Sequence, residues 1–129
     1  MGMTAEFRAV VSQHMMDMFR ELSGDTNPLH RDAEFARAAG HPQPVVFGML
    51  TASLYSTLIG VHLPGRFGVL HGVDIDFHSP VYVGDELIIR GEVAFLSEAV
   101  RRVELKAIVR NGSGRRVSKA TVRAGVHEH

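Results

Sequence analysis

A run of twelve residues, GMLTASLYSTLI at positions 48–59, constrains the fold more than any other part of this 129-residue chain. Apolar side chains occur all the way round this stretch, and only small hydroxyl residues interrupt them. A surface helix keeps a polar face, so a helix that is apolar on every side must be buried on most sides. Twelve residues make a rod of about 18 Å. We therefore expect the rest of the chain to wrap around a central helix at 48–59, which Gly60 ends.

The two parts of the chain on either side of this helix differ in their pattern. Before it, residues 7–11 predict a short strand, and residues 14–22 carry apolar side chains at i, i+3, i+4 and i+7, as a helix with one apolar face does. Asp32 is a predicted N-cap for a second short helix at 32–39. After it, alternating segments with short breaks predict strands at 67–77, 86–95, 100–109 and 116–124. The pattern is α+β, with an antiparallel sheet around one central helix.

Composition limits the possible functions. The 129 residues suit one domain over 1–129, and 45% apolar with 22% charged residues are typical of a folded protein. Fourteen Lys and Arg balance fourteen Asp and Glu, which argues against nucleic acid or an anionic membrane as the partner. The chain has no Cys, and its His residues follow no metal-ligand spacing, so no metal site is expected. Charged residues interrupt the N-terminal apolar stretch, which favours a cytoplasmic location over export.

The densest polar segment is SGDTNPLH at 23–30. Asp25 and His30 lie five residues apart across an Asn-Pro turn, so a bent loop can bring a carboxylate and an imidazole to one small-molecule site. The same residues also suit a purely local role, because Asp25 and Asn27 can bond neighbouring backbone amides in a turn. The segment by itself leaves both interpretations open.

Gly48 is the second candidate. The N-terminus of a helix offers unpaired amides and a partial positive charge, and a residue without Cβ lets a ligand oxygen approach the backbone. Such a position can serve as an oxyanion hole. A glycine needed only for tight packing after the proline-rich loop is the alternative.

The two candidates occur within a longer pattern. This pattern consists of FRELSGDTNPLH at 19–30, followed by Phe35, PVV at 44–46, GML at 48–50, ASL at 52–54, LPG at 63–65, FHSPV at 77–81 and GD at 84–85. It resembles the MaoC-like (R)-specific enoyl-CoA hydratase family. The resemblance covers residues from about 19 to 95. It implies a single hot-dog domain, which is a curved antiparallel sheet wrapped around a central helix. It also implies a homodimer or a higher homo-oligomer.

The resemblance further implies a hydro-lyase activity, the reversible addition of water to a trans-2-enoyl-CoA to give the (R)-3-hydroxyacyl-CoA. Asp25 and His30 would hold the catalytic water, and the backbone N–H of Gly48 would bind the thioester oxygen. Asn27 and Ser56 match positions that support the site, although a turn residue and a helical serine would look the same. No cofactor is implied beyond the CoA or phosphopantetheine that the acyl thioester substrate carries.

One departure from the family pattern concerns Phe47, where the family commonly has His. An apolar ring beside the proposed oxyanion site is expected to affect acyl selectivity more than the reaction. Arg66 follows the LPG turn and resembles a basic position that could meet a phosphate of CoA or of a carrier protein. Both are weaker candidates for substrate binding.

Three other functions remain as alternatives. A dehydratase of acyl-carrier-protein thioesters would use the same residues. A thioesterase would want a carboxylate on or beside the central helix, and residues 48–59 contain none. A catalytically silent acyl-binding module is favoured by Phe47 and disfavoured by the presence of both Asp25 and His30.

Overall fold

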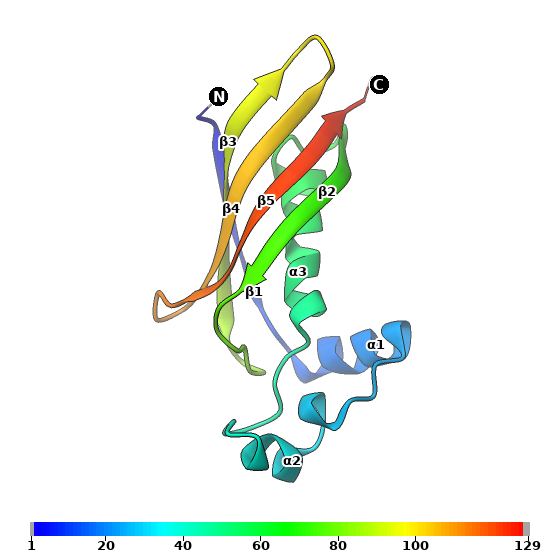
Figure 1. Ribbon diagram of the computed structural model, residues 1–129, viewed down its shortest axis with the longest axis vertical. Coiled ribbons are helices and arrows are strands. Elements are labelled where there is room, and N and C mark those ends of the chain that lie inside the picture. Colours follow the sequence, from blue (N-terminus) through cyan, green and yellow to red (C-terminus); the bar gives the residue numbers. More distant parts are fainter. Residues whose placement is uncertain (1, 128–129) are drawn as a thin grey trace.

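The computed structural model describes residues 2–127, which form one curved antiparallel sheet and a helix that runs along its inner face (Figure 1). The five strands lie in the order β1-β3-β4-β5-β2. Their bounds are β1 Thr4–Val10, β2 Gly68–Phe77, β3 Glu86–Ser97, β4 Arg102–Asn111 and β5 Arg116–Val126. The helices are α1 Gln13–Ser23, α2 Ala33–Ala38 and α3 Gly48–Thr57, with a short 3₁₀ turn, η1, at Pro28–His30. The predicted α+β arrangement is confirmed.

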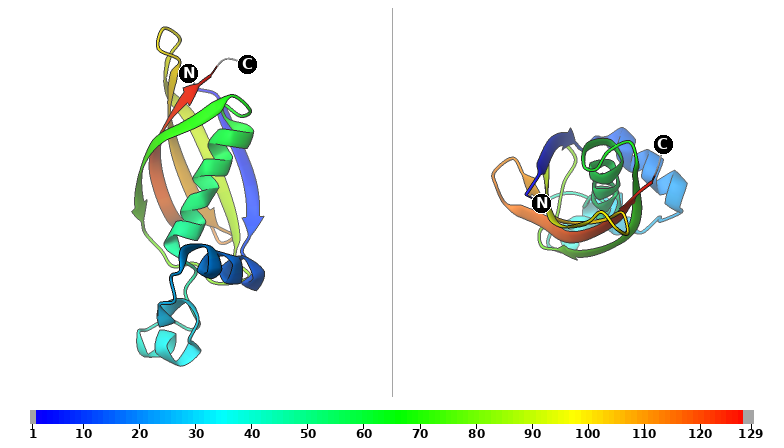
Figure 2. Two further views of the ribbon diagram at one scale, coloured as in Figure 1. Left: turned by 90° about the vertical axis from the view of Figure 1, so that its right-hand side faces the viewer. Right: turned by 90° about the horizontal axis from the view of Figure 1, so that it is seen from above.

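The sheet curves around α3, which lies inside the curve when the molecule is seen from above (Figure 2). Side chains on a strand point alternately to the two faces of a sheet. In β3 and β4 every second residue is accordingly buried against the helix, as in Leu87, Ile89, Leu105 and Val109, which are all fully buried. Gly91 of β3 lets the helix come close, because an added Cβ would lie 2.7 Å from Cδ2 of Leu58. The helix that is apolar all round is thus covered by the sheet on one side.

The prediction that Gly60 ends the central helix is wrong. The α-helix stops at Thr57, and the helical path continues as a π-helical segment, η2, over Leu58–His62. This wider turn places Leu58, Ile59 and Leu63 in the core, where they are at most 7% exposed. The weak helix propensity of one exposed glycine is overridden by this burial. The chain instead reverses at Gly65, whose φ is +90°.

The helices before α3 lie beyond one end of the sheet (Figure 1). Ser12 caps α1 by accepting a hydrogen bond from Met15 N, and Asp32 caps α2 by accepting from Glu34 N and Phe35 N, as predicted for Asp32. The strand ends differ slightly from the predicted ones: β1 begins earlier, at Thr4, β5 ends later, at Val126, and β4 begins and ends later, at Arg102 and Asn111. Within residues 2–127, no helix is both long and apolar enough to cross a membrane.

Candidate active site

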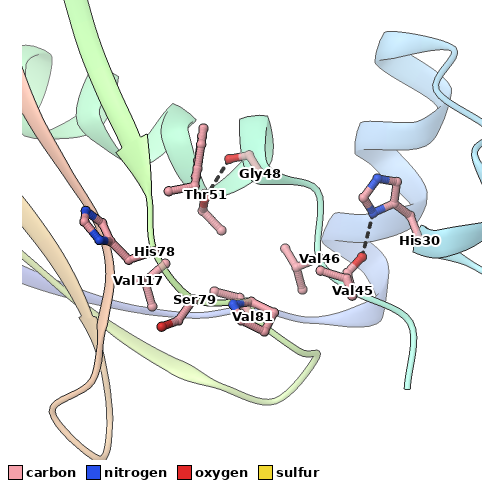
Figure 3. Close-up of a pocket in the computed structure, with 11 residues that line it drawn as sticks. His30, Val45, Val46, Gly48, Thr51, His78, Ser79, Val81 and Val117 are labelled. Carbon is pink, nitrogen blue, oxygen red and sulfur yellow. Dashed lines mark hydrogen bonds between the residues drawn. The ribbon is translucent and has the colours of Figure 1, made fainter. Parts of the chain in front are cut away.

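A cavity of about 300 Å³ lies at the N-terminal end of α3. Its walls come from the loop that leads into α3, the start of α3 itself and the loop that follows β2, with His30 of η1 and Val117 of β5 beside them (Figure 3). The lining residues are His30, Val45, Val46, Gly48, Thr51, Phe77, His78, Ser79, Pro80, Val81 and Val117. The backbone ties two of these walls together, because Val46 N donates to Val81 O at 2.8 Å. Two predicted site residues, His30 and Gly48, therefore meet at one cavity.

His30 is held in place by its own loop. Asn27 caps η1, since its Oδ1 accepts a hydrogen bond from Leu29 N at 2.9 Å, and His30 is the last residue of that turn. The imidazole Nδ1 lies 2.7 Å from the carbonyl oxygen of Val45 (Figure 3). A carbonyl oxygen can only accept, so Nδ1 carries the proton in this hydrogen bond. In the neutral ring Nε2 then keeps its lone pair and can accept a proton.

The imidazole of His30 packs against one aromatic ring, which in turn packs against a second. The ring of Phe47 lies 4.3 Å from that of His30, centroid to centroid, and 4.9 Å from that of Phe19. Phe47 is 3% exposed and belongs to the main core, and it is not among the residues that line the cavity. Ring pairs of this kind contribute about 0.5–1.5 kcal/mol beyond their buried area. The structure therefore places Phe47 behind His30, away from the cavity wall where substrate contact was expected.

Gly48 is the first residue of α3 and faces the cavity. The carbonyl of Phe47 accepts from Leu50 N at 3.1 Å and from Thr51 N at 3.3 Å, which begins the helical ladder. The N–H of Gly48 comes before this ladder, and the N–H groups at the very start of a helix have no partner within it and carry its partial positive charge. Thr51 is buried, and its hydroxyl donates to Gly48 O at 2.6 Å. An oxygen that develops negative charge in this cavity can thus be stabilised at the start of α3.

Asp25 lies on the same loop as His30 but is exposed and does not line the cavity. Its Oδ1 accepts a hydrogen bond from Asn27 N at 3.0 Å, which is the local turn chemistry considered above. Within residues 2–127, no hydrogen bond or ion pair involves its second carboxylate oxygen, which is therefore available to a water molecule. The catalytic role of Asp25 stays a prediction.

Two weaker candidates lie away from the cavity. Ser56 is exposed on α3 and is not a lining residue. Arg66 is also exposed, and its guanidinium lies over the ring of Phe67, 5.5 Å from the centroid. The structure does not bring either side chain to His30.

Sequence reasoning missed several lining residues. His78 is exposed, but it also lines the cavity together with Ser79 (Figure 3). The available signal was the FHSPV segment of the family resemblance, since the spacing of the histidines carries no information. In the described part of the chain, no three His, Cys, Asp or Glu residues gather as a metal site would require.

The chain is similar in sequence and structure to known hydratases and dehydratases. A family model described as "MaoC like domain" matches residues 1–114. An (R)-specific enoyl-CoA hydratase of Aeromonas caviae is 46% identical over 80 residues, which cover 62% of this chain and 60% of that protein. A mitochondrial 3-hydroxyacyl-[acyl-carrier-protein] dehydratase of Arabidopsis thaliana is 42% identical over 79 residues, which cover 61% of this chain and 46% of the relative. The matches thus span about half of the length of these curated relatives.

A solved structure extends the likeness to the whole fold. The (R)-hydratase from Aeromonas caviae involved in PHA biosynthesis superposes with a TM-score of 0.92 and 32% sequence identity. The superposition covers 98% of this chain and 96% of that one.

Proposed function

This chain belongs to the MaoC-like domain family, and from that membership and the cavity at His30 we propose that it is a hydro-lyase, an (R)-specific enoyl-thioester hydratase/dehydratase. Its fold, a curved antiparallel sheet of five strands around a central helix, is the hot-dog fold that such hydratases share. The proposed reaction adds water reversibly to a trans-2-enoyl-CoA and gives the (R)-3-hydroxyacyl-CoA. CoA or phosphopantetheine enters only as part of the substrate.

The reaction makes three demands on the protein. In the hydration direction the water oxygen forms a bond to Cβ of the enoyl thioester while the water loses a proton to a base. The π electrons of the Cα–Cβ double bond move toward the carbonyl, whose oxygen gains negative charge as an enolate. A proton then reaches Cα and restores the thioester carbonyl. The site must therefore supply a base, an acid and donors for the enolate oxygen.

The single observation that carries the proposal is the His30–Val45 hydrogen bond beside the start of α3. The bond of 2.7 Å fixes the proton on Nδ1 and leaves Nε2 of the neutral ring as a proton acceptor. The same cavity is lined by Gly48, whose backbone N–H is the proposed donor to the enolate oxygen. An acid/base group and an oxyanion donor thus border one space of about 300 Å³.

We assign Asp25 as the partner of His30 in holding the catalytic water, one as general base and the other as the source of the proton for Cα. The short 3₁₀ turn that Asn27 caps holds the two residues on one loop, so the supporting role of Asn27 is to fix that loop. The supporting role of Ser56 and the contact of Arg66 with a phosphate remain predictions.

The carrier of the acyl group is CoA or an acyl carrier protein. Relatives of both kinds match this chain: the Aeromonas protein is named for CoA and the Arabidopsis protein for the carrier protein. We propose CoA as the first carrier to test, because the relative named for CoA is 46% identical to this chain over the aligned residues and the relative named for the carrier protein 42%. A cytoplasmic location stays a prediction.

We also propose a homodimer. β2 is an edge strand of ten residues that pairs only with β5 within residues 2–127. A long open edge is normally covered, and a second copy of the same strand can cover it. Val69 and Leu70 of β2 are 43% and 41% exposed, which adds apolar surface at this edge.

The test is the loss of enoyl absorbance when purified protein is mixed with crotonyl-CoA. His30→Asn keeps a donor for the Val45 carbonyl but has no Nε2, so it should fold and lose about 10²-fold or more in kcat. His41→Asn is the matched control, since His41 bonds through Nδ1 to Tyr82 Oη at 3.0 Å and does not line the cavity.

Three outcomes decide between the functions. Hydration that His30→Asn abolishes supports the proposal. Release of free CoA thiol would instead show a thioesterase. A folded wild-type protein with no turnover on CoA or carrier-protein thioesters of any chain length would contradict the proposal and leave a silent binding module.

A further inference from the structure

Phe47 contacts both of the elements on which the proposed function depends. Its ring packs against the imidazole of His30, with 4.3 Å between the centroids and 31° between the ring planes. Its backbone carbonyl accepts the first hydrogen bonds of α3, from Leu50 N and Thr51 N. The residue that follows it is Gly48, the proposed oxyanion donor. Phe47 thus links the imidazole, which its side chain contacts, to the start of the central helix, which its backbone carbonyl contacts.

The ring of Phe47 is itself held firmly. It is 3% exposed, lies in the main core, and packs on its other side against Phe19 of α1 at 4.9 Å. Side chains in a close-packed core keep one rotamer, since movement would require their neighbours to move as well. The surface against which His30 rests is therefore rigid.

The side chain of Phe47 also offers no hydrogen bond. Among residues 2–127 the His30 ring has one hydrogen-bond partner, the carbonyl of Val45. A side chain with a donor or acceptor at position 47 would compete for the ring nitrogens of His30 and could exchange the two tautomers. An apolar ring at this position leaves Val45 to determine which nitrogen carries the proton.

We infer that Phe47 is a positioning residue, which holds the His30 imidazole in the Nδ1–H tautomer with Nε2 available at the cavity. This inference rests on the proposed function for its effect on turnover, but the effect on the tautomer is independent of any substrate. It assigns to Phe47 a role through His30 rather than a contact with the acyl chain.

The test compares Phe47→Leu with the wild-type protein in two measurements. The ¹⁵N chemical shifts of the His30 ring, recorded at a pH at which the ring is neutral, report the tautomer in the free protein. Steady-state kinetics on crotonyl-CoA separate kcat from KM. We expect a single Nδ1–H tautomer in the wild type. In Phe47→Leu we expect a mixture of tautomers, because without the packed ring the imidazole can turn away from the Val45 carbonyl, and a kcat lowered about tenfold or more with KM within about twofold.

A matched control comes from another ring pair. Phe7 stacks on His62, with 4.5 Å between the centroids and 12° between the planes, and neither residue lines the cavity. Phe7→Leu should leave both the His30 tautomer and kcat at their wild-type values. If Phe47→Leu does not fold, Phe47→Met, whose longer and more flexible side chain fills core gaps and also lacks a ring, replaces it.

The inference is overturned if the ring-deleted variant keeps the single tautomer, or if its tautomers mix while kcat stays at the wild-type value. A fall in kcat without any change in the tautomer also overturns it, since Phe47 would then act by another route. If the wild-type protein hydrates no thioester, the proposed function fails, and the ¹⁵N spectra alone decide whether Phe47 holds His30.

Discussion

A Cβ atom built on Gly48 would lie 3.4 Å from Cε1 of Phe77, so the first residue of α3 and the last residue of β2 lie next to each other at the cavity. Phe77 is 51% exposed, and its ring borders the approach to the helix N-terminus. Glycine keeps this approach open where the thioester oxygen is proposed to bind. Gly48 has no unusual φ, so its backbone conformation does not require glycine. The missing side chain matters because it leaves room for the thioester oxygen.

Gly48→Ala should hinder the approach of the thioester oxygen without lowering the stability of the fold. A distance of 3.4 Å is ordinary van der Waals contact, and alanine is a better helix former, so the free energy of unfolding should be unchanged or higher by up to about 1 kcal/mol. We expect kcat on crotonyl-CoA to fall about 10- to 100-fold, because the added methyl group displaces the thioester oxygen from the N–H. Gly60→Ala is the control, since a Cβ there meets no atom within 4 Å. Full activity of Gly48→Ala would show that the thioester oxygen does not need the space beside Gly48, since alanine keeps the backbone N–H.

Asp25→Asn should lower kcat by about 10²-fold or more with little effect on folding. The asparagine oxygen can still accept the hydrogen bond from Asn27 N, and the side chain is exposed, so the turn should persist. What is lost is the negative charge that, in the proposed mechanism, polarises the catalytic water. Asp32→Asn is the matched control, because Asp32 caps α2 and an asparagine cap works as well. Near-normal turnover by Asp25→Asn would show that the carboxylate serves only the turn.

The oligomeric state tests whether a second copy of the chain covers the open edge of β2. Light scattering should give twice the mass of one chain, and amide hydrogens of β2 that point away from β5 should exchange slowly. Both effects should diminish together on dilution below the dissociation constant. A mass of one chain at all concentrations would contradict the homodimer.

Tyr55 of α3 and Ser118 of β5 join the helix to the sheet through a buried hydrogen bond of 2.7 Å. They are 1% and 0% exposed. Tyr55→Phe leaves the Ser118 hydroxyl unpaired in the core and should lower the free energy of unfolding by about 1–3 kcal/mol. The double variant Tyr55→Phe/Ser118→Ala should recover much of this loss, because neither unpaired group remains. Urea unfolding of the three proteins measures the difference, and equal stabilities of the single and double variants would contradict it.

The same pair predicts that the stability of the fold depends on pH in the alkaline range. Burial raises the pKa of Tyr55, and the hydrogen bond from Ser118 lowers it by less. Above a pH of about 10 the unfolded chain therefore releases a proton that the folded chain retains, and stability falls as the pH rises. Below that pH both states hold the proton, and this group adds no slope. Tyr55→Phe should remove this part of the alkaline decline, and an unchanged slope between about pH 9 and 11 would contradict the assignment.

Much of the fold follows from local pattern. The run at 48–59 has no polar face, so other elements must bury it. The alternation of apolar and polar residues after residue 66 predicts a sheet with one buried face. Capping at Asp32 depends only on the next three residues, so the sequence is sufficient to predict it. The motif around Asp25 and His30 was recognisable because its residues are contiguous in the chain.

What the tertiary structure decided is how distant segments meet. The end of the helix at Gly60 was mispredicted because burial of Leu58, Ile59 and Leu63 outweighs the local preference of one glycine. The placement of His78 on the cavity and of Phe47 behind His30 depends on how the loop before α3 packs against the loop after β2. Periodicity determines which residues share a face of one element, but it carries no information about contacts between elements, and those contacts form the site.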